Sequence, residues 1–265
     1  MKAILMKENH SIKGLILDMD GVLWRDQQPI GDLPRIFDRI HEIGLKVTLA
    51  TNNATQSVEQ YHSKLQGFGV FLELNQIINS SQAAAHYLSS LYPHGGTVYI
   101  VGEQGLFTTL ASRGFCHGEQ GVSAVVAGLD RSFTYEKLRK AALLIRSGVK
   151  FIGTNSDSTL PTPDGLVPGA GSILAAIEAA TGVKAEIVGK PSPGLYQIAM
   201  ERMRTSPHKT LVVGDRLQTD IAGAQLVGCP CALVLSGVTK SDEAREWLPP
   251  PDWIKPDLTS VLDEL

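Results

Sequence analysis

The chain has 265 residues, of which 43% are hydrophobic and 19% charged, with a net charge of −3. At about 150 residues per domain this length allows one large domain or two of moderate size, and the charge gives no basic surface for nucleic acid or an anionic membrane. No apolar stretch approaches the roughly 18 residues of a membrane span. The three cysteines, Cys116, Cys229 and Cys231, make no disulfide framework and favour the cytoplasm.

Short apolar segments alternate with amphipathic ones from the start of the chain. The first strands are expected at residues 14–17, 46–50 and 77–78, and the first helices at residues 33–43, 57–67 and 80–91. The strand segments are apolar throughout, which is typical of a sheet covered on both faces. This order of strands and helices favours a mostly parallel sheet.

The same alternation continues to the end of the chain. Further strands are expected at residues 97–102, 123–129, 150–155, 211–213 and 232–235, and further helices at residues 104–113, 135–146, 172–180 and 258–265. Acidic residues follow strands only in the outer parts of the chain. This asymmetry predicts a domain inserted at residues 80–184 within a core formed by residues 1–79 and 185–265. The expected fold class is α/β, a doubly wound and mostly parallel core sheet with an inserted α/β domain.

Four short motifs place polar residues at a strand end or in a Gly/Pro turn. They are DMDG at 18–21, TNN at 51–53, GKP at 189–191 and GDRLQTD at 214–220. Ligands of an open parallel sheet bind beyond the carboxyl ends of its strands, so these motifs should converge there. The charged residues brought together would be Asp18, Asp20, Asp215, Asp220 and Lys190. Each motif alone is usually a solvated turn or a helix cap, but all four in this order argue against coincidence.

Carboxylates gathered in this way cannot all be ionised without compensation. Oxygen ligands on strand-end loops suit a hard divalent cation, and Mg²⁺ most of all. Around that cation, a phosphoryl group would be cradled by the Lys190 ammonium, the Thr51 hydroxyl and the backbone N–H groups of Gly21, Asn52 and Asn53.

The spacing of Asp18 and Asp20 suits a two-step transfer. In an extended segment, residues i and i+2 project to the same side, so both carboxylates can flank one phosphorus atom. One would attack while the other exchanges a proton with the ester oxygen. Gly21 lets the chain turn sharply after them.

Two further features stay open. The stretch GAGS at 169–172 either opens a helix that cradles an anion or, as is more usual for small residues, forms a tight turn. Asn155 and Asp157 are about equally suited to a substrate contact and to a structural loop.

The order DMDGVLW, TNN, VGKPSP and VVGDRLQTDI resembles the four motifs of the haloacid dehalogenase superfamily of phosphotransferases. The insert, above all TNSDSTLPTPDGLVPGAGS at 154–172, is similar to the large α/β cap of the NagD-like, or 4-nitrophenylphosphatase, branch. The resemblance covers nearly the whole chain apart from about the first ten residues, to which no role is assigned.

The resemblance implies roles for the four aspartates. Asp18 would be the nucleophile that forms an aspartyl-phosphate. Asp20 would protonate the leaving group and then activate water. Mg²⁺ would be held by the Asp18 carboxylate, the Asp20 backbone carbonyl and Asp215, while Asp220 would orient metal-bound water from behind.

The resemblance also implies that Thr51 and Asn52 bind phosphate oxygens and that Lys190 pairs with Asp18 and the phosphoryl group. The expected function is a Mg²⁺-dependent phosphatase of small phosphomonoesters. A receiver-like phospho-aspartate signalling protein and a low-activity sugar-phosphate-binding regulator are the alternatives. The substrate stays open among sugar phosphates, nucleoside monophosphates, phosphoglycolate and pyridoxal phosphate. The oligomeric state is also open, a homodimer through the cap being one alternative.

Overall fold

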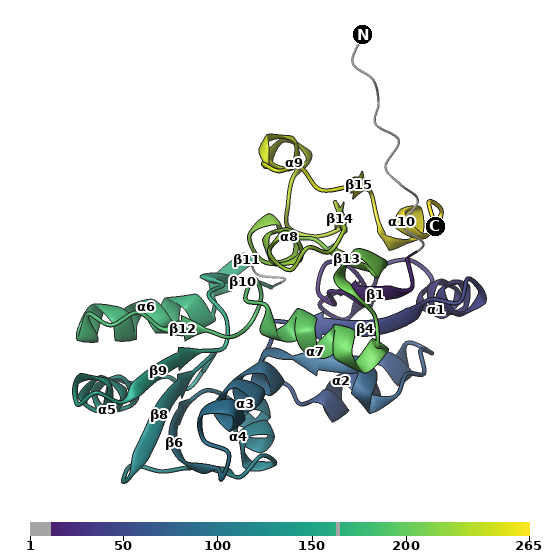
Figure 1. Cartoon of the computed structure of the whole chain (residues 1–265). Coiled ribbons are helices and arrows are strands. Elements are labelled where there is room, and N and C mark those ends of the chain that lie inside the picture. The colour runs from purple at the N-terminus through teal and green to yellow at the C-terminus, as the bar shows by residue number, and fades with distance from the viewer. Residues whose placement is uncertain (1–11, 163–164) are drawn as a thin grey trace.

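The computed structural model describes residues 12–162 and 165–265. It contains two parallel sheets in separate parts of the molecule, each with helices packed against it (Figure 1). The first ten residues, to which the sequence assigns no role, lie outside the described residues. None of the described helices is long and apolar enough to cross a membrane.

The larger sheet has six strands, each parallel to its neighbours. Their order across the sheet is β15 (Trp253–Lys255), β14 (Cys231–Val234), β13 (Thr210–Gly214), β1 (Gly14–Leu17), β4 (Lys46–Thr51) and β5 (Ile77–Asn79). Leu15 and Leu17 of β1 pack into one apolar cluster and Ile16 into another. Both faces of the sheet are therefore buried, which explains why its strands carry no polar alternation.

Helices cover both faces of this sheet. They are α1 (Leu33–Glu42), α2 (Val58–Gly67), α7 (Gly194–Met203), α8 (Ala222–Leu226), α9 (Ser241–Glu246) and α10 (Leu258–Leu262). In α1 the Asp32 side chain caps the first turn by accepting from the Arg35 N–H, and Leu33, Ile36 and Ile40 form its buried stripe. This stripe packs into the cluster that contains Leu15 and Leu17, whereas α7 packs into the cluster on the opposite face.

The second sheet has five parallel strands. Their order is β12 (Glu186–Ile187), β9 (Lys150–Gly153), β8 (Val122–Ala127), β6 (Gly96–Val101) and β7 (Phe115–His117). The helices of this part of the chain are α3 (Ser80–Leu91), α4 (Gln104–Ala111), α5 (Tyr135–Arg146) and α6 (Ala170–Thr181). β12 lies just beyond residue 184, where the inserted domain was expected to end, and the domain boundaries stay a prediction.

Short elements complete the described chain. Two antiparallel hairpins are formed by β2 (Trp24–Arg25) with β3 (Gln28–Pro29) and by β10 (Thr159–Thr162) with β11 (Gly165–Pro168). Single turns of 3₁₀ helix lie at η1 (Leu74–Gln76) and η2 (Pro207–Lys209), and a π-helical turn lies at η3 (Leu217–Ile221).

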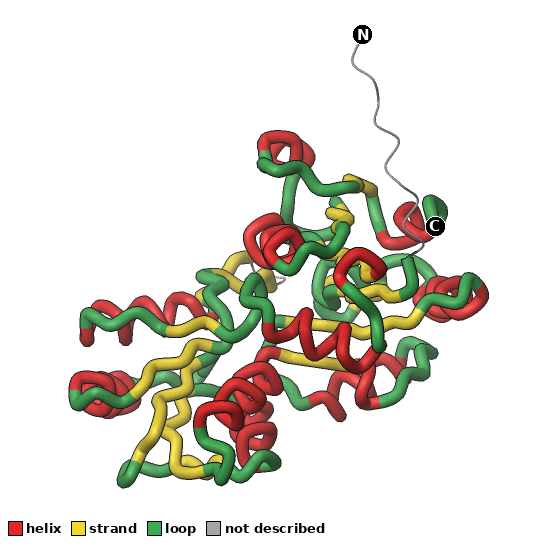
Figure 2. The backbone as a smooth tube through the Cα atoms, viewed as in Figure 1, coloured by secondary structure: helices red, strands yellow, loops and turns green. Residues whose placement is uncertain are grey.

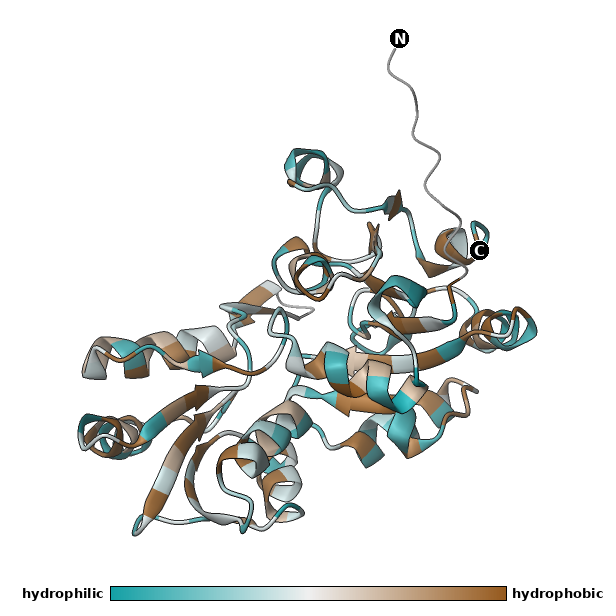
Figure 3. Cartoon of the chain, viewed as in Figure 1, coloured by the Kyte–Doolittle hydropathy of each residue, from teal (hydrophilic) through white to brown (hydrophobic). Residues whose placement is uncertain are grey.

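The predicted fold class is confirmed, and each expected strand and helix is present with ends that differ by at most three residues. Hydrophobic residues dominate the strands of both sheets (Figure 3). The longest element that the sequence pattern missed is α7. Its buried residues are Leu195, Tyr196, Ala199, Met200 and Met203. A helix buried on several sides shows no clear polar face, so its 3.6-residue period is hard to recognise.

Candidate active site

The candidate site lies at the carboxyl ends of β1, β4 and β13. The chain leaves β1 for β4 on one side and returns to β13 on the other, so the strand order reverses here. Ligands bind at such a point in open α/β sheets. The loops after β1 and β4, green in Figure 2, carry the motifs DMDG and TNN, while GDRLQTD runs from the end of β13 into η3 and GKP follows β12.

Lys190 is the centre of this site. Its side chain is 3% exposed, and Nζ donates to Asp18 Oδ1 at 2.7 Å, to Asp220 Oδ1 at 2.6 Å and to the Ala50 carbonyl at 2.9 Å. All three donors of the ammonium are thus used. Burial alone would lower the pKa of Lys190, but the two carboxylates raise it above its ordinary value. The lysine therefore stays cationic.

Asp215, which follows β13, has one carboxylate oxygen without a partner. Its Oδ2 accepts from the Val238 N–H at 2.7 Å, whereas Oδ1 is buried and receives no hydrogen bond within the described part of the chain. One oxygen each of Asp18, Asp215 and Asp220 lie within 4.8 Å of one another. A buried carboxylate oxygen without a donor is unfavourable, and oxygen donors suit a hard divalent cation. This donor set therefore fits Mg²⁺.

The charges of the cluster are not balanced by the protein alone. Burial raises the pKa of the Asp18 carboxyl well above its ordinary value, and the charges of Asp220 and Asp215 add to the effect while Lys190 opposes it. Burial, with the charge of Asp220, raises the pKa of Asp215 to about 7. One ammonium faces three carboxylates here, so a divalent cation would supply the missing positive charge.

Asp220 lies on the π-helical turn η3 and holds Lys190 in place. Its Oδ1 accepts from Lys190, and its Oδ2 accepts from the Arg216 N–H at 3.1 Å. Gly214 allows this close approach, because a Cβ there would lie 2.2 Å from the Cβ of Asp220. The water-orienting role expected of Asp220 stays a prediction.

Two residues of the TNN motif are used differently from the expectation. The Asn52 side chain pairs with the backbone of Lys190, accepting from its N–H at 2.7 Å and donating to its carbonyl at 3.0 Å. The Asn53 N–H donates to Thr51 Oγ1 at 3.1 Å instead of facing the site, because the chain turns tightly after β4. The phosphate-binding role expected of Thr51 stays a prediction.

The loop after β1 also differs from the expectation in one donor. The Gly21 N–H, expected to point at the phosphoryl group, donates to the Trp24 carbonyl at 2.7 Å because the loop closes on itself. Gly21 has a left-handed φ of 83°, and a Cβ there would lie 2.4 Å from Asp215 Oδ2. Asp20 accepts from the fully buried Trp24 indole Nε1–H at 2.9 Å, which fixes its carboxylate beside the loop.

Sequence reasoning missed the polar residues that hold the TNN loop from behind. Their side chains donate to its carbonyls: Asn79 Nδ2 to Gln56 at 2.9 Å, Ser80 Oγ to Asn52 at 2.6 Å and Ser81 Oγ to Ala54 at 3.3 Å. The three side chains are fully buried. The available signal was the run of three polar residues at the junction of an apolar strand and a helix.

A carboxylate from the second sheet also reaches the site. Asp157 Oδ2 lies 3.4 Å from Asn52 Nδ2, and Asp157 Oδ1 lies 3.8 Å from an Arg216 guanidinium nitrogen. Asn155 Nδ2 donates to the Asn52 carbonyl at 2.8 Å. Burial raises the pKa of the Asp157 carboxyl, and Arg216 opposes the effect. Asn155 and Asp157 therefore contact the catalytic loops, while Arg216 was not singled out from the sequence.

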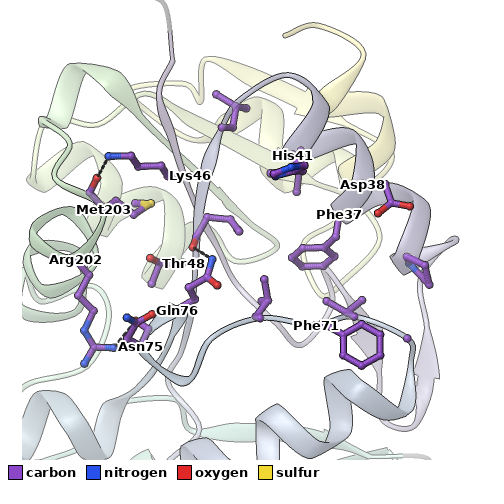
Figure 4. Close-up of a pocket in the computed structure, with 17 residues that line it drawn as sticks. Phe37, Asp38, His41, Lys46, Thr48, Phe71, Asn75, Gln76, Arg202 and Met203 are labelled. Carbon is purple, nitrogen blue, oxygen red and sulfur yellow. Dashed lines mark hydrogen bonds between the residues drawn. The ribbon is translucent and has the colours of Figure 1, made fainter.

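A pocket of about 480 Å³ lies at the opposite end of β4 and takes no part in this site. Figure 4 shows Lys46 extending toward Met203 and Arg202 toward Asn75. Lys46 Nζ donates to the Met203 carbonyl and Arg202 to the Asn75 carbonyl at 2.8 Å. At about 3.3 Å per residue, β4 separates this pocket from the catalytic loops by most of its length.

Two family models match the chain. Residues 15–116 match a haloacid dehalogenase-like hydrolase model, and residues 187–261 match a second model of the same hydrolase type. An acid sugar phosphatase of Staphylococcus saprophyticus is 32% identical over 254 residues, which are 96% of this chain and 98% of the relative.

Solved structures agree with the family models. NagD of E. coli superposes with a TM-score of 0.86 at 32% identity, covering 94% of this chain and 97% of NagD. A glycerol phosphate phosphatase of Mycobacterium tuberculosis, in complex with magnesium, has a TM-score of 0.88 at 35% identity, covering 95% of this chain and 76% of that protein.

A doubly wound sheet that gathers carboxylates and one lysine at its switch point is typical of a hydrolase that works by phosphoryl transfer. The chain belongs to the haloacid dehalogenase superfamily and, within it, to the branch that contains NagD and the 4-nitrophenylphosphatases. The family predicted from the four motifs is confirmed.

Proposed function

We propose that the protein is a Mg²⁺-dependent phosphatase of small phosphomonoesters that forms an aspartyl-phosphate on Asp18. The observation that carries the proposal is the Lys190 ammonium held between Asp18 and Asp220, with an Asp215 oxygen within 4.8 Å of an oxygen of each aspartate. The relatives support it, since the acid sugar phosphatase and the glycerol phosphate phosphatase make sugar phosphates and glycerol phosphate candidate substrates of this chain.

In the first step a carboxylate oxygen of Asp18 attacks phosphorus, and the bond between phosphorus and the ester oxygen breaks. Asp20, held by the Trp24 indole, gives a proton to the departing oxygen so that the alcohol leaves uncharged. The positive charge of Lys190 and the Thr51 hydroxyl offset the charge of the phosphoryl oxygens.

In the second step Asp20, now a carboxylate, removes a proton from water as the water attacks the aspartyl-phosphate. The bond between phosphorus and the Asp18 oxygen breaks, inorganic phosphate leaves, and Asp18 is restored. Asp20 thus serves as acid in one step and base in the next, which its position two residues from the nucleophile allows.

The residues that would hold Mg²⁺ are Asp18, Asp215 and the backbone carbonyl of Asp20. When bound, the cation would supply the positive charge that the three carboxylates lack and would offset the charge of the phosphoryl oxygens. The Val238 N–H fixes Asp215 for this purpose, because it donates to Oδ2 and leaves Oδ1 without a hydrogen bond within the described residues.

Phosphate release from a panel of phosphomonoesters tests the proposal. We expect turnover with Mg²⁺, loss of turnover by at least about 100-fold in EDTA, and recovery when Mg²⁺ is returned in excess. A long-lived phosphoprotein that releases no phosphate would favour the receiver-like alternative. Binding of a sugar phosphate without turnover would favour the regulator.

A second expectation concerns pH and stability. A carboxyl whose pKa is higher in the folded than in the unfolded chain stabilises the fold at low pH, and this contribution is lost as pH rises through the folded pKa. Asp18 and Asp215 are of this kind. The Tm without metal should therefore fall between about pH 5.5 and about pH 8, and Mg²⁺ should raise Tm more at the higher pH. Equal Mg²⁺ shifts at both pH values would contradict this reading.

The proposal also covers where the protein lies in the cell and whether it forms a dimer. A cytoplasmic location is supported by the cysteines, none of which forms a disulfide within the described residues. A homodimer through the second sheet and its helices stays a prediction. Its support is the exposed apolar surface of α5, where Tyr135 and Leu143 lie about two turns apart.

A further inference from the structure

The loop that carries Asp157 is held in a fixed shape. The Asp157 N–H donates to Asn155 Oδ1 at 3.1 Å, and its carbonyl accepts from the Gly171 N–H at 2.8 Å. Asn155 in turn donates to the Asn52 carbonyl at 2.8 Å. The loop is therefore fastened on one side to α6 and on the other to a catalytic loop of the core sheet.

The stretch GAGS explains how α6 supports this loop. A Cβ on Gly169 would lie 2.4 Å from the Asp157 carbonyl oxygen, and one on Gly171 would lie 2.4 Å from the Ser156 carbonyl oxygen. The backbone of α6 therefore lies directly against residues 156–157, which larger side chains would push away. The Gly171 N–H donates to the Asp157 carbonyl, so GAGS supports the loop by packing against it instead of binding an anion.

The Asp157 carboxylate itself makes only long contacts. Within the described residues its side-chain donors are Asn52 Nδ2 at 3.4 Å and Arg216 at 3.8 Å, whereas charge-assisted hydrogen bonds are about 2.7–2.9 Å long. A carboxylate has room for about four donors. The side chains of Asp157 and Arg216 are each 23% exposed, so a ligand in the site can reach both. A rigidly held carboxylate with unused acceptor capacity is suited to a donor that the substrate brings.

The chemistry of these two residues suits a hydroxyl group. It can donate to Asp157 and accept from Arg216, which bridges the 3.8 Å between carboxylate and guanidinium. A cationic amine would meet the positive charge of Arg216, and an anion would meet the negative charge of Asp157. Resting on the phosphatase function proposed above, we propose that Asp157 is a specificity residue that binds a leaving-group hydroxyl, so that the site selects phosphomonoesters of polyols.

Two matched substrates test this inference. Glycerol phosphate and propyl phosphate have the same number of carbon atoms, but only the first has free hydroxyls. The wild-type enzyme should prefer glycerol phosphate in kcat/KM by about tenfold or more, since a hydrogen bond to a charged acceptor discriminates by at least that factor. In Asp157→Ala the ratio of the two kcat/KM values should fall toward one, and Asp157→Asn, which keeps an uncharged acceptor, should lie between.

The ratio of the two kcat/KM values distinguishes a role of Asp157 in specificity from a purely structural role. If Asp157 only held Asn52 and Arg216 in place, both substrates would slow equally and the ratio would not change, which overturns the inference. Glu136→Gln removes one exposed carboxylate from α5 and should leave the ratio as it is. A wild-type ratio near one, with clear turnover of both esters, overturns the inference alone. No turnover of either ester or of p-nitrophenyl phosphate would overturn the proposed function itself.

Discussion

Asp18→Asn is expected to lower kcat by about 10⁴-fold or more for every phosphomonoester that the protein hydrolyses, because it removes the nucleophile. Asparagine keeps the shape of aspartate, and its amide oxygen can still accept from Lys190. Phosphate release should be measured together with trapping of the phosphoenzyme by acid quench. Neither product is expected from the variant.

The same substitution should stabilise the metal-free fold. Burial raises the pKa of Asp18 well above its ordinary value, so its ionised form costs stability at neutral and higher pH. A neutral amide removes this cost. At about pH 8 in EDTA we expect the Tm of Asp18→Asn to exceed that of the wild type by a few degrees. An inactive variant that is more stable than the wild type cannot owe its inactivity to unfolding.

Asp38→Asn is the matched control, since Asp38 is an exposed carboxylate on α1 at the other end of the core sheet. It should leave kcat unchanged and change the free energy of unfolding by no more than about 0.5 kcal/mol. Turnover by Asp18→Asn within tenfold of the wild type would remove Asp18 from the role of nucleophile.

The candidate site could be predicted from sequence as far as its residues follow strands directly. Asp18, Thr51 and Asp215 come at or just after the ends of parallel strands, and the carboxyl ends of such strands meet at one edge of a sheet. The chemistry of these residue types then indicates a metal and a phosphoryl group. Convergence of this kind needs only that the strands run parallel in one sheet, which the alternation of strands and helices predicts.

The directions of backbone donors could not be predicted, because they depend on the torsion angles of each turn. Gly21 and Asn53 were expected to face a phosphoryl group, yet the N–H of each closes its own loop. Asp157 shows a second limit. It reaches the core through contacts between loops of the two parts of the chain, with Asn52 and Arg216, which the sequence pattern of either part does not encode. The helix α7 was missed for a related reason, since burial on several sides removes its polar face.

Gly237→Ala should weaken the metal site as severely as a change of a metal ligand. A Cβ at this position would lie 1.9 Å from Asp215 Oδ2 and 2.4 Å from the Asp215 Cβ, far inside contact distance. The carboxylate would have to move, and the hydrogen bond from the Val238 N–H would be lost with it. A displacement of this size at a catalytic group costs about 100-fold in rate. We expect a fall of that order in kcat and a rise of at least about tenfold in the Mg²⁺ concentration that gives half-maximal activity.

Gly67→Ala is the matched control, because Gly67 ends α2 without a left-handed φ, and a Cβ added there would meet no atom within 4 Å. It should leave Mg²⁺ activation unchanged. The double variant Gly237→Ala/Asp215→Asn tests whether the alanine acts through Asp215. If the alanine acts by displacing Asp215, the double variant should be no worse than Asp215→Asn alone, since the second change has nothing left to disturb. Losses that multiply would mean instead that residue 237 damages the site independently of Asp215, and the steric explanation would then be wrong.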